Sequence, residues 1–132
     1  MVTATDTGSG LVLVAGSTGY IGRRLVAELV GRGQRVRCLA RSPHKLDGET
    51  WRRQVEVVRG DVLDASTLHA CFDGVDVAYY LVHSIGADEE WEERDRRAAC
   101  NFRDAASTAG VGQIIYLGGL GDEHSAKLSP PT

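Results

Sequence analysis

The chain alternates short apolar runs with amphipathic segments, and this alternation limits the folds that are open to it. Five runs rich in branched apolar residues are predicted strands: residues 11–15, 35–40, 54–58, 75–82 and 113–117. Three segments carry helical spacing or capping signals: residues 20–30, 64–72 and 89–109. Parallel strands need long connections, and intervening helices supply them. The pattern therefore predicts an α/β fold built on a doubly wound parallel sheet.

Three glycines stand at intervals of three between the first predicted strand and the first predicted helix. The stretch reads Ala-Gly-Ser-Thr-Gly-Tyr-Ile-Gly and covers residues 15–22. Glycine weakens helices and strands alike, so this junction indicates a backbone that turns sharply or lies against something. In a doubly wound sheet, the first strand-to-helix turn is where a pyrophosphate lies on the helix N-terminus. The stretch predicts a dinucleotide site, although a glycine-rich turn without a ligand has the same composition.

Each glycine has its own predicted role in such a turn. Gly16 would allow the tight turn, Gly19 would let the backbone approach the diphosphate, and Gly22 would let the helix pack closely on the strand. The spacing G-x-x-G-x-x-G differs from the G-x-G-x-x-G fingerprint, so the interpretation rests on the strand before the turn and the helix after it. The predicted cofactor contacts in this stretch are Gly16, Ser17, Thr18, Gly19, Tyr20, Ile21 and Gly22.

The second predicted strand ends in a basic residue where an NAD-selective site would carry an acidic one. Arg41 could pair with a 2′-phosphate and stack on adenine, or it could be a solvated loop arginine. Ser42 and Ser17 are weaker candidates for the same phosphate. We therefore expect NADP as the cofactor, with NAD as the second possibility.

An acidic residue follows the third predicted strand. Asp61 could accept a hydrogen bond from an adenine amino group, or it could cap the turn in which it lies. Val62, its neighbour, would then border the same cofactor.

Composition argues against several other functions. The net charge of −3 and pI near 5.8 provide no basic field for nucleic acid. No segment has the length of a membrane span or the pattern of a leader, so we expect no membrane contact and a cytoplasmic location. The cysteines Cys38, Cys71 and Cys100 are odd in number and far apart, which predicts reduced thiols. The histidines share no metal-ligand spacing, so no metal site is expected.

Longer stretches extend the pattern beyond the glycines. They read GDVLD at residues 60–64, VDVAYYLVHS at 75–84 and AACNFRDAASTAGVGQIIYLGGLG at 98–121. Together with the glycine turn and Arg41, they resemble the atypical short-chain dehydrogenase/reductase superfamily, in its NmrA-like NAD(P)H-binding branch. The resemblance implies a Rossmann-like sheet of strand order 3-2-1-4-5. It also implies that Leu81, Val82 and His83 border the cofactor and that Asn101 matches a recurrent helix asparagine. From its position alone, His83 could equally be a loop residue.

The sequence departs from the catalytic members of that superfamily. Those members place a hydroxyl after the fifth strand and a Tyr-x-x-x-Lys pair on the next helix. Here Gly118 and Gly119 follow the fifth strand, and no Tyr-x-x-x-Lys occurs, so no catalytic residue is assigned. We expect the front part of a longer protein that lacks its C-terminal strands, with a flexible segment 1–10, an incomplete NAD(P)-binding domain 11–121 and a loose tail 122–132. The uncovered fifth strand would then favour self-association.

Two functions remain open at this point. The first is the NAD(P)H-binding domain of a short-chain-type oxidoreductase that acts on an unknown small molecule. The second is a non-catalytic dinucleotide-binding module, a sensor or an assembly partner. Turnover by the complete gene product would distinguish them, and these 132 residues alone are expected to bind cofactor without reducing a carbonyl substrate.

Overall fold

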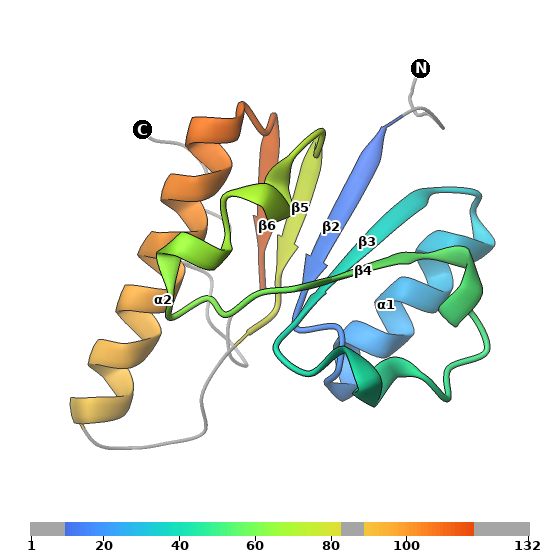
Figure 1. The fold of residues 1–132 in the computed structure, drawn as a ribbon, viewed down its shortest axis with the longest axis horizontal. Helices are drawn as coiled ribbons and strands as arrows, with labels where there is room; N and C mark the ends of the chain where they lie inside the picture. The colour runs from blue at the N-terminus through green and yellow to red at the C-terminus, as the bar shows by residue number, and fades with distance from the viewer. Residues whose placement is uncertain (1–9, 83–88, 118–132) are drawn as a thin grey trace.

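The computed structural model describes residues 10–82 and 89–117, and these form a five-stranded parallel sheet (Figure 1). The strands are β2 (Leu11–Ala15), β3 (Arg35–Ala40), β4 (Glu56–Arg59), β5 (Val77–Tyr80) and β6 (Gln113–Tyr116). Their order across the sheet is β4-β3-β2-β5-β6, and all four pairings are parallel. In chain order this is 3-2-1-4-5, so the predicted fold class and strand order are confirmed.

The central strand β2 is buried on both faces because each face of the sheet carries its own apolar cluster. Successive side chains of a strand point to opposite faces. Leu11 and Leu13 therefore pack with Phe102 of helix α2 (Glu89–Ala109), whereas Val12 and Val14 pack on the other face against helix α1 (Tyr20–Gly31). This double burial explains why the sequence of β2 is continuously apolar rather than alternating.

Aromatic rings fill the face of the sheet that α2 covers. The Phe102 ring lies 4.9 Å from that of Phe72 and 4.8 Å from that of Tyr80, measured between centroids. Tyr80 in turn stacks on Tyr116 of β6 at 5.2 Å. Such pairs contribute about 0.5–1.5 kcal/mol each beyond the area they bury. They fix α2 against β5 and β6.

The helix predicted over residues 64–72 is wrong in type. The segment forms two 3₁₀ turns, Ala65–Thr67 and Ala70–Phe72. Asp64 does cap the first of them, since its carboxylate accepts from the Ser66 N–H at 3.2 Å. Thr67 explains the tighter geometry, because its hydroxyl donates to the Asp64 carbonyl at 2.7 Å and accepts from the Asp61 N–H at 2.9 Å. These local bonds compete with a regular helix ladder.

The bounds of β4, β5 and β6 also differ from the predicted ranges by one or two residues at an end. β4 begins at Glu56 because Arg52–Gln54 forms a 3₁₀ turn, and β5 spans only Val77–Tyr80 within the predicted 75–82. The connection from β3 to β4 holds a further 3₁₀ turn, Pro43–Leu46, that the sequence pattern did not indicate. Its Leu46 packs in the same apolar cluster as α1, so the connection covers that face without a full helix.

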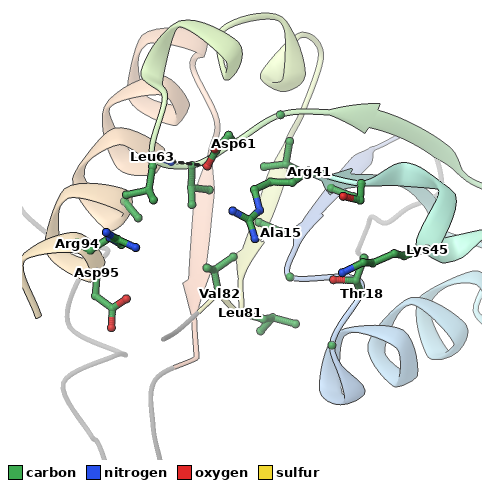
Figure 2. A pocket seen from close by; sticks show the side chains of 18 residues that line it. Ala15, Thr18, Arg41, Lys45, Asp61, Leu63, Leu81, Val82, Arg94 and Asp95 are labelled. Carbon is green, nitrogen blue, oxygen red and sulfur yellow. Dashed lines mark hydrogen bonds between the residues drawn. The ribbon is translucent and has the colours of Figure 1, made fainter. Parts of the chain in front are cut away.

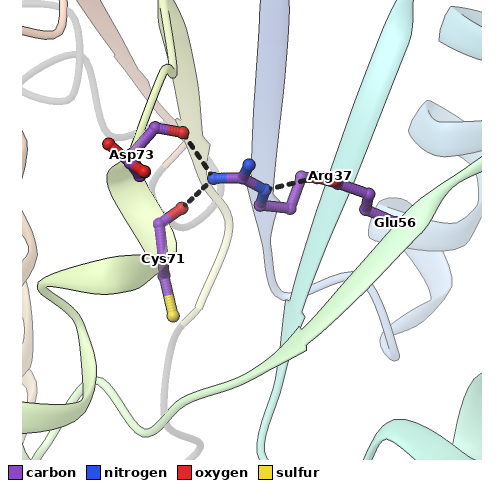
Figure 3. A network of polar contacts seen from close by, with 4 residues as sticks. All are labelled: Arg37, Glu56, Cys71 and Asp73. Carbon is purple, nitrogen blue, oxygen red and sulfur yellow. Dashed lines mark hydrogen bonds and ion pairs between the residues drawn. The ribbon is translucent and has the colours of Figure 1, made fainter.

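One partly buried arginine ties the sheet to the segment before β5 (Figure 3). Arg37 lies on β3, and its Nε donates to the Glu56 carboxylate on β4 at 2.6 Å. Its Nη1 donates to the backbone carbonyls of Cys71 and Asp73 at 2.7 and 2.8 Å. Hydrogen bonds from a charged group contribute about 1.5–3 kcal/mol each. Arg37 therefore holds the second 3₁₀ turn against the sheet.

Helix α1 lies directly against the turn that leads into it. A Cβ atom on Gly22 would come within 2.0 Å of the Gly16 carbonyl oxygen and 2.8 Å of the Ser17 Cα. Gly16 itself has a φ of +96°, a region that side chains rarely adopt. The close packing predicted for Gly22 is confirmed, and its partner is the backbone of the turn.

We predict that Gly22→Ala destabilises the fold, because the methyl group would push α1 away from the turn. The loss should be about 1–3 kcal/mol of unfolding free energy, the usual effect of overpacking. Gly31→Ala is the control on the same helix, since a Cβ there meets no atom within 4 Å. Chemical denaturation of both variants measures the difference. Equal stability of the two variants would contradict this account of the turn.

Candidate functional site

A cleft of about 460 Å³ opens beyond the carboxyl ends of four strands (Figure 2). It lies where the strand order reverses, between β2 and β5, which is the place where open α/β sheets bind ligands. Four segments and one helix supply its walls. The lining residues are Ala15, Gly16, Thr18, Gly19, Leu39, Ala40, Arg41, Ser42, Lys45, Gly60, Asp61, Val62, Leu63, Leu81, Val82, Arg94, Asp95 and Ala98.

The glycine turn forms the floor of the cleft next to the end of β5. A Cβ on Gly16 would lie 3.0 Å from the carbonyl carbon of Leu81, so the turn and β5 are packed backbone against backbone. Gly19 differs from Gly16 and Gly22, which are both closely packed. Its φ of −83° suits any residue, and a Cβ there would meet only the Gly16 carbonyl oxygen, at 3.6 Å. The space over Gly19 is therefore open toward the cleft.

The N-terminus of α1 faces this open space without a capping side chain. Gly19 is the N-cap residue, it makes no side-chain cap bond, and the first turn contains no acidic residue. The first N–H groups of a helix have no acceptor within the helix, and its dipole favours a negative charge there. The turn therefore fits the diphosphate of a dinucleotide, which such a helix end binds through backbone N–H groups.

The structure does not bring all residues of the glycine stretch into the cleft. Ser17 is fully buried, and its hydroxyl donates to the Leu39 carbonyl at 3.4 Å, so its side chain does not reach the cleft. Tyr20 and Ile21 project into solvent with 73% and 52% of their surface exposed. Gly22 is enclosed by the turn. Of the cofactor contacts predicted in this stretch, only Gly16, Thr18 and Gly19 line the cleft.

Basic side chains from the end of β3 form one wall. Arg41 extends into the cleft (Figure 2). Ser42, the next residue, also lines it. Lys45 lines the same wall, and sequence reasoning missed it. Its position depends on the 3₁₀ turn Pro43–Leu46, in which the Lys45 N–H donates to the Ser42 carbonyl at 3.0 Å. The only sequence signal for this contact was a lysine four residues after Arg41. The 3₁₀ turn that directs its side chain toward the cleft was not predicted.

The loop after β4 forms the opposite wall, and Asp61 shapes it. One carboxylate oxygen of Asp61 accepts from the Leu63 N–H at 3.0 Å, which is the capping role that its sequence position allowed. The same residue lines the cleft. Asn101 of α2 holds this loop, because its Nδ2 donates to the Val62 carbonyl at 2.9 Å. Asn101, which matched the superfamily pattern, thus stabilises the loop wall of the cleft.

The remaining lining residues come from β5 and α2. Leu81 and Val82 border the cleft as predicted, whereas His83 lies outside the described residues. Arg94, Asp95 and Ala98 were not predicted. Arg94 and Asp95 belong to no sequence motif, and Ala98 is only the first residue of the stretch 98–121. Their place in the cleft depends on how α2 packs across the sheet.

The buried nucleophilic groups of the described chain are held in their neutral forms. Burial raises the pKa of the Cys38 thiol to about 11 and also raises the pKa of the Cys71 thiol. Burial, together with Tyr116 and Asp95, raises the pKa of Tyr80 well above its usual range. A catalytic tyrosine acid needs the opposite shift at neutral pH. Tyr80 moreover lines a separate cavity beside α2 rather than the cleft.

The described part of the chain also lacks two features, a metal-ligand cluster and a membrane-spanning helix. Within it, no three histidine, cysteine or acidic side chains gather in a way that could hold a metal ion. None of its helices has the length and apolar character needed to cross a membrane.

Comparison with known proteins agrees with this geometry. A family model described as NAD(P)H-binding matches residues 16–131. A 3 beta-hydroxysteroid dehydrogenase/Delta 5→4-isomerase of Mycobacterium tuberculosis is 35% identical over 117 residues, a match that covers 81% of this chain and 31% of that protein. Cinnamoyl-CoA reductase 1 of Oryza sativa subsp. japonica is 32% identical over 120 residues, covering 86% of this chain and 36% of the reductase. The chain thus spans about a third of the length of these relatives.

Solved structures give the same picture. A short-chain dehydrogenase/reductase superfamily protein from Agrobacterium tumefaciens with bound NAD has a TM-score of 0.65 at 28% identity, covering 80% of this chain and 31% of that one. A mutant uronate dehydrogenase from the same organism, complexed with NAD, has a TM-score of 0.70 at 25% identity, covering 83% and 41%. The family match over most of the chain shows that this protein belongs to the NAD(P)H-binding family of atypical, NmrA-like short-chain dehydrogenases/reductases.

Proposed function

We propose that the cleft binds NADP(H) and that the chain is the cofactor-binding part of an oxidoreductase that acts on a small-molecule substrate. The observation that carries the proposal is the open space over Gly19, which leaves the uncapped N-terminus of α1 facing the cleft. A bound nicotinamide would supply the hydride chemistry. The described residues supply binding and orientation.

The N-terminus of α1 and the basic wall after β3 suit the phosphate groups of such a cofactor. Backbone N–H groups at the start of α1 would hold the diphosphate. Arg41 and Lys45, both on the wall that follows β3, would hold a 2′-phosphate on the adenine-side ribose. An acidic residue at this position would instead favour the unphosphorylated ribose of NAD. The absence of one from this wall supports a preference for NADP.

Catalysis by the complete protein is part of the same proposal. The relatives named above as a dehydrogenase and a reductase support it, and the alternative of a non-catalytic module is not favoured. We assign no described cleft residue as the proton donor. Hydride transfer by the complete gene product would therefore be the direct test of catalysis. The expected cytoplasmic location stays a prediction.

The diphosphate site is tested by Gly19→Val. Its branched side chain would occupy the space over the turn and weaken NADPH binding by about ten- to a hundred-fold, since charged hydrogen bonds of about 1.5–3 kcal/mol would be lost. Gly48→Val is the matched control, because Gly48 lies outside the cleft and a Cβ there meets no atom within 4 Å. Calorimetric titration measures the affinities. The proposal fails if Gly19→Val binds NADPH as tightly as the control does.

The cofactor preference is tested by comparing NADPH with NADH. We expect the wild-type chain to bind NADPH more tightly, and Arg41→Ala to reduce that advantage by about ten- to a hundred-fold. Lys45→Ala should have a smaller effect, since an ammonium group binds phosphate as a point charge rather than as a fork. Arg59→Ala is the control for net charge, because Arg59 is exposed and does not line the cleft. Equal affinities of the wild type for both cofactors would return Arg41 to the role of a solvated loop residue.

Self-association through β6 is a further part of the proposal. Among the described strands β6 lies at an edge of the sheet, and Leu117, which follows it, is 47% exposed. An edge strand with apolar neighbours favours pairing with another chain, and a lysine at such an edge opposes it. We expect a concentration-dependent mass above that of the monomer in light scattering, reduced by Leu117→Lys. A wild-type chain that stays monomeric at every concentration would exclude this contact.

A further inference from the structure

Helix α2 contributes a basic residue to the cleft that the proposed phosphate contacts do not use. Arg94 lines the cleft together with Asp95 and Ala98. Figure 2 shows its guanidinium directed into the cleft, on the side away from Lys45 and the glycine turn. Lys45 and Arg94 therefore lie at different ends of the cleft, and Arg41 lies between them (Figure 2).

The position of Arg94 is fixed by the same helix face that braces the loop after β4. Residues 94, 98 and 101 follow one another at helical spacing, so they share a face of α2. Asn101 binds the Val62 carbonyl on this face, and Ala98 is buried between Asn101 and Arg94. Arg94 is consequently held beside the loop wall rather than on a freely moving segment.

The surroundings of Arg94 suit a flat, nitrogen-containing ring. Val62 and Leu63 line the loop wall, Val82 lies at the end of β5, and the small side chain of Ala98 leaves room between them. A planar guanidinium can stack on an aromatic face or donate to ring nitrogens. Asp61 on the same wall offers a carboxylate oxygen for an exocyclic amino group.

We infer that Arg94 recognises the adenine ring of the cofactor by stacking on it, at the end of the cleft between α2 and the loop after β4. This inference rests on the proposed function and adds a recognition residue that lies far in sequence from the glycine turn. Because Arg94 is exposed, we expect a moderate contribution. The ring contact should change affinity about three- to thirty-fold.

The experiment compares two ligands, 2′,5′-ADP, which carries adenine and phosphates, and inorganic pyrophosphate, which carries no ring. Arg94→Ala should weaken 2′,5′-ADP binding by about three- to thirty-fold and leave pyrophosphate binding unchanged. Arg94→Lys keeps the charge without the planar group and should recover only part of the loss. Arg97→Ala is the matched control, because Arg97 is exposed on the same helix and does not line the cleft.

The outcomes separate this inference from the proposed function. A wild-type chain that binds neither NADPH nor 2′,5′-ADP overturns both. A wild type that binds both ligands, with Arg94→Ala binding them equally well, overturns the role of Arg94 alone. Equal losses for Arg94→Ala and Arg97→Ala, full recovery by Arg94→Lys, or an equal loss of pyrophosphate binding would each mean that Arg94 acts only as a distant charge.

Discussion

The contact between helix α1 and the turn before it governs the geometry of the whole cleft. Gly22 lets the helix lie on the backbone of Gly16, and the positive φ of Gly16 turns the chain sharply at the end of the central strand. A larger residue at either place would move the helix N-terminus away from the strand ends. The electrostatic field of α1 is useful for an anion only because this contact directs the helix at the cleft.

The second determinant of the cleft is the way α2 crosses the other side of the sheet. Phe102 anchors the helix through its contacts with Phe72 and Tyr80, and Asn101, one residue earlier, binds the loop after β4. Adjacent positions on one helix thus serve the core and the cleft wall. A change in the packing of Phe102 would also shift the loop wall of the cleft, because densely packed interiors transmit such displacements.

The relatives are much longer than the region of this chain that matches them. The matched dehydrogenase and reductase are about three times as long as the matched region, so most of their length lies beyond it. The described residues supply a cofactor cleft with a basic wall and a helix N-terminus, and their buried cysteine and tyrosine side chains lie outside it.

The sequence alone determined the parallel sheet, the glycine turn and the basic residue at the end of β3, because each depends on local spacing or on a motif. The strand order was predicted from the resemblance to the superfamily and not from spacing. Only the tertiary structure decided which side chains face the cleft. Ser17 belongs to the motif but is buried against β3, whereas Lys45 and Arg94 belong to no motif and line the cleft. Residues 64–72 were likewise predicted incorrectly from their spacing. They form 3₁₀ turns instead of a helix, because the Thr67 side chain bonds to the backbone. Periodicity records which faces are apolar, but the direction of a loop side chain depends on contacts with residues that are distant in sequence.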